Sequence, residues 1–260
     1  MATPSDPVRR EVLSNGQVLW LTLNSPKGNI LDTKMIEGLG AALDEHDSPR
    51  LKAIVFEGEG AHFSFGASVP EHEPARAPSM LATFHSLFRK LSSLAIPTFA
   101  CVRGQCKGGG MELASYCTWI FASPSAQLGQ PEIKLAVFPP MASLLLPWRL
   151  GAGRGLDLCV SGRSVTAAEA LDMGLVYAIT DDPRTAIMAF IAENLLPTSA
   201  SSLRFAERAA RLGLRRLLEE TLPALEKLYL EELMKTPDAN EGIAAFIEKR
   251  KPVFSGEGLA

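Results

Sequence analysis

Three short segments carry residue types that suit chemistry on a polarised carbonyl group. The first is FSFGAS, residues 63–68; the second runs from the glycines 108–110 to Glu112; the third is GQPEI, residues 129–133. Glycines that lead into a helix leave backbone N–H groups unobstructed at the positive end of the helix dipole. Such donors stabilise a developing oxyanion, so the second segment predicts an anion-stabilising turn beside a carboxylate.

Each segment also has an ordinary structural interpretation. Three glycines before a helix occur in many tight turns. Glu112 alone would only complement the helix dipole, and Glu132 alone would be a surface turn residue. The chain lacks the patterns GxGxxG, GxxxxGK[ST] and GxSxG, so neither a nucleotide phosphate site nor a serine hydrolase is indicated.

The elements that must position these segments alternate between strand and helix. Short apolar runs predict strands, and apolar residues at helical spacing predict helices. The strands are expected over 18–23, 51–56, 98–102 and 119–122, and the helices from Asp32 to about Asp44, over 80–94 and from Met111 onward. This alternation predicts an α/β fold with right-handed crossovers and a largely parallel sheet.

From Val165 onward the pattern is almost entirely helical. Thr166 and Glu169 form a capping box, and helices are expected over 166–173, 183–195, 199–212, 214–235 and 238–250. We therefore predict an α/β core with the active site over residues 1–196 and a helical region over 197–260. So short a helical region is small for an independent core. It should pack on the core or on a neighbouring subunit.

Composition narrows the classes of protein. The chain has 260 residues, of which 47% are hydrophobic and 21% charged, and this excludes a disordered chain. The net charge of −3 argues against broad, non-specific binding of nucleic acid. Three prolines interrupt the longest apolar run, 135–148, and the N-terminus has no hydrophobic stretch that would serve as a secretory signal. We expect a soluble, cytoplasmic protein.

The cysteines and histidines give no sign of a metal site. The four cysteines form no CxxC pair, and the four histidines lack zinc-type spacing. His62 and His72 flank one loop and are the sole candidate pair, but solvated loop histidines are the better interpretation of them. No metal is expected.

Taken together, the segments resemble the crotonase (enoyl-CoA hydratase/isomerase) superfamily over nearly the whole chain. The matching stretches are LNSPKGNILD, HFSFGAS, GQCKGGGMELA, GQPEI and SGRSVTAAEALDMGLV, in the family's order and spacing. The resemblance implies a crotonase-like spiral of ββα units with a helical C-terminal region for trimerisation, often as a dimer of trimers. It also implies a coenzyme A thioester substrate, with no metal and no separate cofactor.

The resemblance assigns roles to four residues. The backbone N–H groups of Ala67 and Gly109 match the two donors of the family's oxyanion hole, and Glu112 and Glu132 match its two catalytic glutamates. Many relatives lack one glutamate. The presence of both favours addition or removal of water, since two carboxyl groups in different protonation states can divide the proton transfers.

Further residues fall where relatives contact the substrate. Beside the oxyanion hole these are Phe65, Gly66, Ser68 and Gly108. Lys27 matches a position near the nucleotide end of coenzyme A, although a plain loop lysine is the alternative.

Within the superfamily, the chain is most similar to the branch that hydrates cyclic dienoyl-CoA thioesters in anaerobic benzoyl-CoA degradation. FSFGASVPEH, GQPEIKLAVFPPMASLLLP, SSLRFAERAAR and YLEELMKTPDANEG carry this similarity. Ordinary crotonases have a small, Gly-rich stretch where this chain has Phe138-Pro139-Pro140-Met141-Ala142. We interpret this stretch, with Phe138 and Pro140, as a wall of the acyl pocket that suits a ring; neutral repacking is the alternative. Two other hypotheses remain: a straight-chain enoyl-CoA hydratase or isomerase, and a non-enzymatic RNA-binding relative.

An arginine-rich stretch lies in the helical region. It comprises Arg204, Arg208, Arg211, Arg215 and Arg216. A solvated helix face is the simplest interpretation. Contact with a coenzyme A phosphate, in this subunit or the next, is the second. RNA binding is the third, and the absence of interleaved aromatic residues argues against it.

Overall fold

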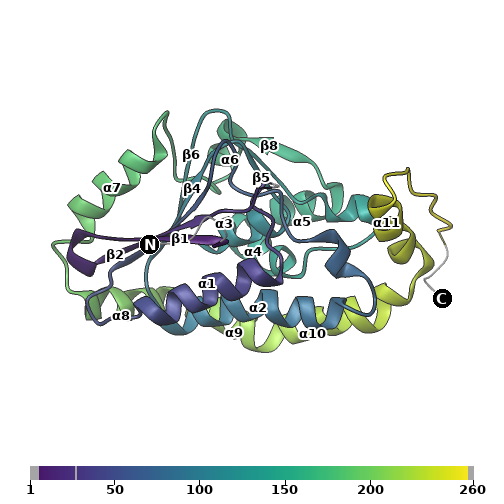
Figure 1. The fold of residues 1–260 in the computed structure, drawn as a ribbon, viewed down its shortest axis with the longest axis horizontal. Coiled ribbons are helices and arrows are strands. Elements are labelled where there is room, and N and C mark those ends of the chain that lie inside the picture. The colour runs from purple at the N-terminus through teal and green to yellow at the C-terminus, as the bar shows by residue number, and fades with distance from the viewer. Residues whose placement is uncertain (1–5, 27, 257–260) are drawn as a thin grey trace.

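A six-stranded sheet forms the centre of the computed structural model, which describes residues 6–26 and 28–256 (Figure 1). Its order is β1-β2-β3-β4-β6-β9, and every neighbouring pair except the antiparallel β1–β2 is parallel. The strands are β1 Val8–Leu13, β2 Val18–Leu23, β3 Ala53–Gly58, β4 Thr98–Val102, β6 Trp119–Ala122 and β9 Ala178–Ile179. The largely parallel sheet confirms the interpretation of the strand–helix alternation.

Helices cover both faces of this sheet, which explains why its inner strands β2, β3 and β4 are buried along their whole length. Successive side chains of β2 alternate: Val18 and Trp20 pack against α7, whereas Leu19 and Leu21 pack into the larger core on the side of α1 and α2. The helices of the core region are α1 Thr33–His46, α2 Ala77–Leu94, α3 Gly109–Tyr116, α4 Pro140–Leu150, α5 Ala152–Ser161, α6 Ala167–Asp172 and α7 Pro183–Asn194.

Short sequence patterns predicted several of these elements correctly. The strands over 18–23, 98–102 and 119–122 are confirmed residue for residue. Asp32 caps α1 by accepting a hydrogen bond from the Met35 N–H at 2.8 Å, and Thr166 caps α6 in the same way from Glu169.

Other elements were missed by the sequence analysis. Strand β1 and a second sheet of β5 Gln105–Lys107, β7 Gln127–Gly129 and β8 Ser164–Thr166 were not predicted, nor were α4 and α5. The prolines concealed α4: Pro140 occupies its first turn, where a missing N–H costs nothing, and Pro147 lies inside it. At Pro147 the backbone of α5 comes so close that a methyl group on Gly155 would lie 2.4 Å from the proline nitrogen.

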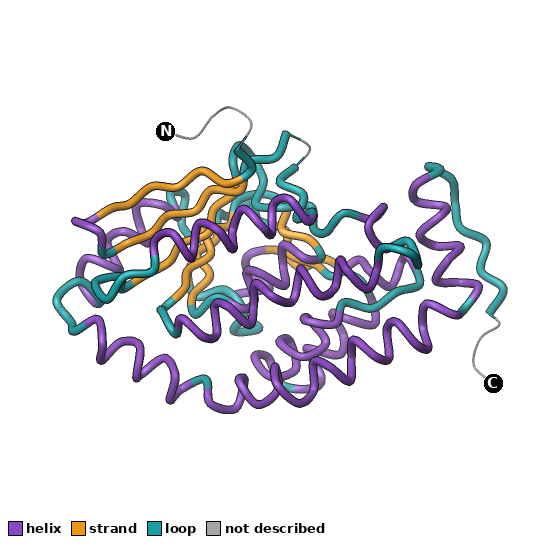
Figure 2. The backbone as a smooth tube through the Cα atoms, turned by 60° about the horizontal axis from the view of Figure 1, so that its bottom comes forward, coloured by secondary structure: helices purple, strands orange, loops and turns teal. Residues whose placement is uncertain are grey.

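The chain from Ala200 to Ile247 is helical except at Arg211 and Thr236. Helix α8 (Ala200–Ala210) is followed by a nearly continuous helix of α9 Leu212–Arg216, η4 Leu217–Thr221, α10 Leu222–Lys227, η5 Leu228–Glu232 and η6 Leu233–Lys235, and then by α11 Pro237–Ile247 (Figure 2). Segments η4 and η5 are π-helical turns. In Figure 1, α8 to α10 run along the lower side of the molecule, next to α1 and α2.

Three of the five arginines attach these helices to the core, so a solvated face is the wrong interpretation for them. Arg204 donates to the Ser48 carbonyl at 2.7 Å, and Arg211 donates to the Tyr116 carbonyl at 2.7 Å. Arg215 donates to the carbonyl of Ser92. Because a guanidinium group always carries its charge and five donors, it can bind carbonyls at the ends of neighbouring elements. Arg208 and Arg216 are exposed.

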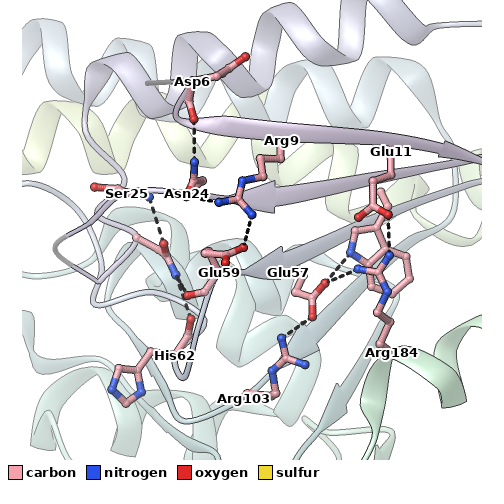
Figure 3. Close-up of polar contacts among 12 residues, drawn as sticks. Asp6, Arg9, Glu11, Asn24, Ser25, Glu57, Glu59, His62, Arg103 and Arg184 are labelled. Atoms are coloured by element: carbon pink, nitrogen blue, oxygen red, sulfur yellow. Dashed lines mark hydrogen bonds and ion pairs between the residues drawn. The ribbon is translucent and has the colours of Figure 1, made fainter. Parts of the chain in front are cut away.

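A buried carboxylate connects three neighbouring strands of the sheet. Glu57 of β3 accepts hydrogen bonds from Trp20 Nε1 of β2 at 2.7 Å and from Arg103, just after β4, at 2.5 Å (Figure 3). Arg184 of α7 donates to the same carboxylate at 2.9 Å and stacks on the Trp20 ring. Since β3 and β4 lead into residues 63–68 and 104–110, this cluster holds the two chemistry-bearing loops at one edge of the sheet.

Candidate active site

The FSFGAS loop is held in place by its backbone. Phe65 N–H donates to the Gly28 carbonyl, and the Gly66 carbonyl accepts from Leu31 N–H, both at 2.9 Å. The buried Ser64 hydroxyl donates to the Asn29 carbonyl at 2.7 Å. Gly66 has φ +102°, a conformation that glycine adopts without strain. These contacts fix the direction of the next N–H group, that of Ala67.

The backbone nitrogens of Ala67 and Gly109 face the same space. A methyl group built on Gly109 would lie 3.2 Å from the Ala67 nitrogen, so the two loops are in close contact. Gly109 is the first residue of α3, and the N–H groups of a helix's first turn have no intrahelical acceptor. Within the described part of the chain, the Ala67 N–H also has no acceptor. Two free donors converge there.

Glu112 lies in the first turn of α3 and is almost fully buried, with 4% of its surface exposed. Its Oε1 accepts a hydrogen bond from the backbone N–H of Ala142, in α4, at 2.8 Å. Burial raises the pKa of this carboxyl group to about 7, although the N–H groups of Ala142 and Met141 oppose the rise by stabilising the charged form. Near neutral pH it can therefore give or take a proton.

Glu132 comes from the short helix η3 (Pro131–Leu135) and reaches the same pocket. Gly108 has φ +50°, which favours glycine, and a methyl group there would lie 2.6 Å from Glu132 Oε1, so the carboxylate would have to move. The Gln130 amide, oriented so that its nitrogen donates, lies 3.0 and 3.1 Å from the two carboxylate oxygens. Burial and, next, the charge of Glu112 raise the pKa of Glu132 well above its usual range. The two carboxyl groups thus titrate as a pair.

One pocket brings together the four residues that matched the family's catalytic positions. Ala67, Gly109, Glu112 and Glu132 all line it. Its other walls are His72, Met80, Leu81, Phe84, His85, Phe138, Pro139, Pro140 and Tyr229. The cavity at its centre measures about 20 Å³, close to the room that one water molecule needs.

The remaining predicted contact residues fall in different places. Phe138 and Pro140 line the pocket, as the wall interpretation requires. Met141 does not: it is fully buried in the main hydrophobic core, so including it in that wall was wrong. Phe65 is half exposed, and its ring makes an edge-to-face contact with the ring of His62.

Three further positions flank the oxyanion-hole candidates without lining the pocket themselves. Gly66 and Gly108 lie beside the two free N–H groups, and Ser68 precedes the short helix η2 (Val69–His72). Lys27 lies outside the described residues.

Several pocket residues were missed by the sequence analysis. Met80, Leu81, Phe84 and His85 come from the apolar face of α2, whose helical spacing indicated only core packing. Tyr229 comes from the C-terminal helices, which we expected to pack on the core or on a neighbouring subunit but not to line the site. The one available signal was a histidine in an otherwise apolar helix face.

The loop histidines are used for backbone contacts. His72 Nδ1 lies 2.9 Å from the Ser68 carbonyl, and His62 Nδ1 accepts from Gln105 N–H at 3.2 Å. Among residues 6–26 and 28–256, no three His, Cys, Asp or Glu side chains gather in a way that would hold a metal ion. In the same ranges, no helix is both long and apolar enough to cross a bilayer.

Comparison with known proteins identifies the family. The family model described as enoyl-CoA hydratase/isomerase matches residues 14–257. The chain belongs to the enoyl-CoA hydratase/isomerase, or crotonase, family. It is 45% identical to a cyclohexa-1,5-dienecarbonyl-CoA hydratase of Thauera aromatica, over 96% of this chain and 97% of the relative. It is 37% identical to a probable enoyl-CoA hydratase of Mycobacterium tuberculosis, over 90% and 93% of the two chains.

Solved structures confirm the crotonase fold. An enoyl-CoA hydratase from Mycobacterium avium subsp. paratuberculosis superposes with a TM-score of 0.82 at 28% identity, covering 96% of this chain and 98% of that one. An enoyl-CoA hydratase from Bacillus halodurans gives a TM-score of 0.84 at 19% identity, covering 92% and 99%. The predicted α/β crotonase architecture with a helical C-terminal region is therefore confirmed, and the pocket between the two loops lies in a crotonase scaffold.

Proposed function

We propose that this crotonase is a hydro-lyase that hydrates cyclohexa-1,5-diene-1-carbonyl-CoA to 6-hydroxycyclohex-1-ene-1-carbonyl-CoA. The observation that carries the proposal is the 45% identity, along nearly the full length of both chains, to a hydratase named for that substrate. The two buried carboxyl groups and two free N–H donors in one pocket support hydration chemistry.

In this mechanism the N–H groups of Ala67 and Gly109 bind the thioester carbonyl oxygen. Charge that develops there during attack is stabilised by the two donors, and losing one such donor typically costs about 10²–10³-fold in kcat. Because the donors belong to the backbone of two braced loops, they need no reorganisation as the charge forms. No metal or separate cofactor takes part in the proposal; coenzyme A enters as part of the substrate.

The ring substrate requires 1,4-addition. In substrate numbering, the oxygen of water bonds to C2 while the C1=C2 π electrons move toward the carbonyl and give a dienolate. The dienolate then takes a proton at C5, so that C1=C6 becomes the double bond and C5=C6 is lost. One water is consumed, its hydroxyl at C2 and the equivalent of its proton at C5. Glu112 and Glu132 jointly remove the water proton and supply the proton at C5.

We place the reaction in anaerobic benzoyl-CoA degradation and expect the enzyme in the cytoplasm. We also propose that it works as a trimer or dimer of trimers, with residues 197–260 contributing to the subunit contacts. Large apolar side chains that are exposed on the single chain, such as Leu156, Val160 and Phe205, support self-association.

Straight-chain hydration is the second candidate, favoured by the 37% identity to a probable enoyl-CoA hydratase. The decisive experiment incubates the purified enzyme with cyclohexa-1,5-diene-1-carbonyl-CoA and, in parallel, with crotonyl-CoA, and follows the mass gain of one water. We expect a much larger kcat/KM for the ring. Equal or greater kcat/KM for crotonyl-CoA would overturn the ring assignment and leave a straight-chain hydratase.

A further inference from the structure

His85 is held by a carboxylate of the C-terminal helices. It lies on α2 with none of its surface exposed, and its Nδ1 is 2.6 Å from Glu226 Oε1 of α10. Arg89 donates to the same oxygen at 2.9 Å. Burial lowers the pKa of His85, which favours the neutral ring. An ionised carboxylate only accepts hydrogen bonds, so Nδ1 carries the proton and Nε2 is left as an acceptor.

The Nε2 atom of His85 is buried and has no hydrogen-bond partner in the part of the chain that the structure describes. His85 lines the pocket that also holds Glu112 and Glu132. Buried polar atoms in native proteins are rarely left unpaired, because the loss of water is not compensated. An unpaired acceptor in the wall of an acyl pocket indicates that the pocket's occupant supplies a donor.

Tyr229 presents a second such atom. Its side chain is 1% exposed, and its hydroxyl oxygen is likewise buried without a hydrogen-bond partner among the described residues. It lines the same pocket from η5, and its ring packs edge-on against Phe138 with centroids 5.4 Å apart. Met80, Leu81 and Phe84, which line the same pocket, have apolar side chains and offer these two atoms no hydrogen-bonding group.

We propose that His85 Nε2 and the Tyr229 hydroxyl together bind the alcohol group of the hydrated acyl product. An alcohol both donates and accepts, so its O–H would donate to His85 Nε2 while its oxygen accepts from the Tyr229 O–H. Glu226 is the positioning residue that fixes the ring of His85. The inference rests on the proposed hydratase function, and it makes the C-terminal helices part of the acyl-binding site.

The test compares ligands that differ by the hydroxyl group. Calorimetry measures the Kd of 6-hydroxycyclohex-1-ene-1-carbonyl-CoA and of cyclohex-1-ene-1-carbonyl-CoA, in a Glu112→Gln, Glu132→Gln background that prevents turnover. His85→Asn retains a donor toward Glu226 but has no Nε2, and Tyr229→Phe removes only the hydroxyl. Each should weaken binding of the hydroxylated thioester about three- to tenfold and leave the other unchanged. Tyr177→Phe, at an exposed position, is the matched control.

Equal weakening of both thioesters, or no weakening of either, would overturn the proposal, because the residues would then serve packing alone. The wild-type turnover assay tests the hydratase function separately. If that assay favours crotonyl-CoA, the same comparison is made with 3-hydroxybutyryl-CoA and butyryl-CoA. Selective weakening of 3-hydroxybutyryl-CoA would support hydroxyl binding even though the ring substrate was wrong, and the absence of selectivity would overturn it.

Discussion

Glu112 of α3 accepts a hydrogen bond from the backbone N–H of Ala142 in α4. This hydrogen bond joins the two helices. The contact fixes the Oε1 atom of a carboxyl group that lines the pocket. It also stabilises the charged form of a side chain whose burial favours the neutral form. The balance holds the pKa of Glu112 at about 7, near the pH at which a group that must exchange protons is most effective.

Replacing either glutamate by glutamine should abolish most turnover. Glu112→Gln and Glu132→Gln each keep the shape of the side chain but remove proton transfer, so we expect kcat to fall about 10²–10⁴-fold. The Kd for a coenzyme A thioester should change little, since the N–H donors of Ala67 and Gly109 remain. Steady-state kinetics and calorimetry check the two quantities. Near-normal kcat in either variant would remove that residue from the mechanism.

Glu112→Gln should also change how stability depends on pH. The folded-state pKa of Glu112 lies at about 7, above the ordinary value of 4.5, so the folded protein holds this proton more tightly than the unfolded chain. The free energy of unfolding therefore falls as pH rises from about 4.5 to 7, by an amount on the order of 3 kcal/mol for this group. Above pH 7 the wild type keeps a buried charge that the variant lacks.

Urea unfolding of both proteins at pH 5 and pH 8 measures this effect. The variant should gain stability relative to the wild type at pH 8 and show little difference at pH 5, because the amide oxygen of the introduced glutamine can still accept a hydrogen bond from the Ala142 N–H. A difference of the same size at both pH values would show that Glu112 is not protonated in the folded protein at low pH.

Gly109→Pro tests the oxyanion donor. Proline removes the N–H but is tolerated at the first position of a helix, where Gly109 lies. Turnover should therefore disappear while the circular dichroism spectrum is retained. Gly109→Ala keeps the N–H and serves as the control; its methyl group would lie 3.1 Å from the Phe84 ring, so a milder loss is expected. A folded and fully active proline variant would contradict the assignment.

The sequence alone predicted the structure correctly where a residue's role depends on its near neighbours in the chain. Asp32 and Thr166 cap helices as their residue types predict, and the glycines before Glu112 mark a turn that the structure uses for close loop contact. It did not predict the role of a residue whose contacts lie in an element far away in the sequence. Met141 packs in the core, and Arg211 binds the carbonyl of Tyr116, 95 positions earlier in the chain.

The same limit applies to the acyl pocket. His85 becomes noteworthy only when α10 places Glu226 against it, 141 positions later. Tyr229 reaches the glutamates only because the C-terminal helices fold back over the core. No periodicity or spacing along the chain encodes such pairings, which depend on the packing of whole helices.

Assembly is expected to require the C-terminal helices. Light scattering of the intact protein should give a trimer or a hexamer, because the single chain exposes large apolar side chains such as Phe205 and Leu212. Deleting residues 200–260 would remove Arg211 and Tyr229 as well as that surface, so we expect aggregated or unfolded chain. A stable, active monomer, whether of the intact protein or of the truncated one, would refute the role of these helices in assembly.

Ring selectivity should depend on Phe138 and not on Met141. Phe138 lines the pocket and packs against Tyr229, so Phe138→Ala enlarges the acyl site and should lower the preference, in kcat/KM, for the cyclic dienoyl-CoA over crotonyl-CoA. Met141 is fully buried in the core, so Met141→Ala should cost about 2–5 kcal/mol of stability and leave the preference unchanged.

Hydration in deuterated water tests the same substrate assignment independently, through the position of the deuterium in the product. During hydration of the ring by the wild type, the label should appear at C5 of the original ring, opposite the carbon that receives the hydroxyl group. Label at C1 would instead indicate ordinary 1,2-addition and assign the enzyme to the straight-chain type of chemistry. If Met141→Ala erodes the preference as much as Phe138→Ala does, the shape of the core as a whole, and not the Phe138 wall, sets the choice of substrate.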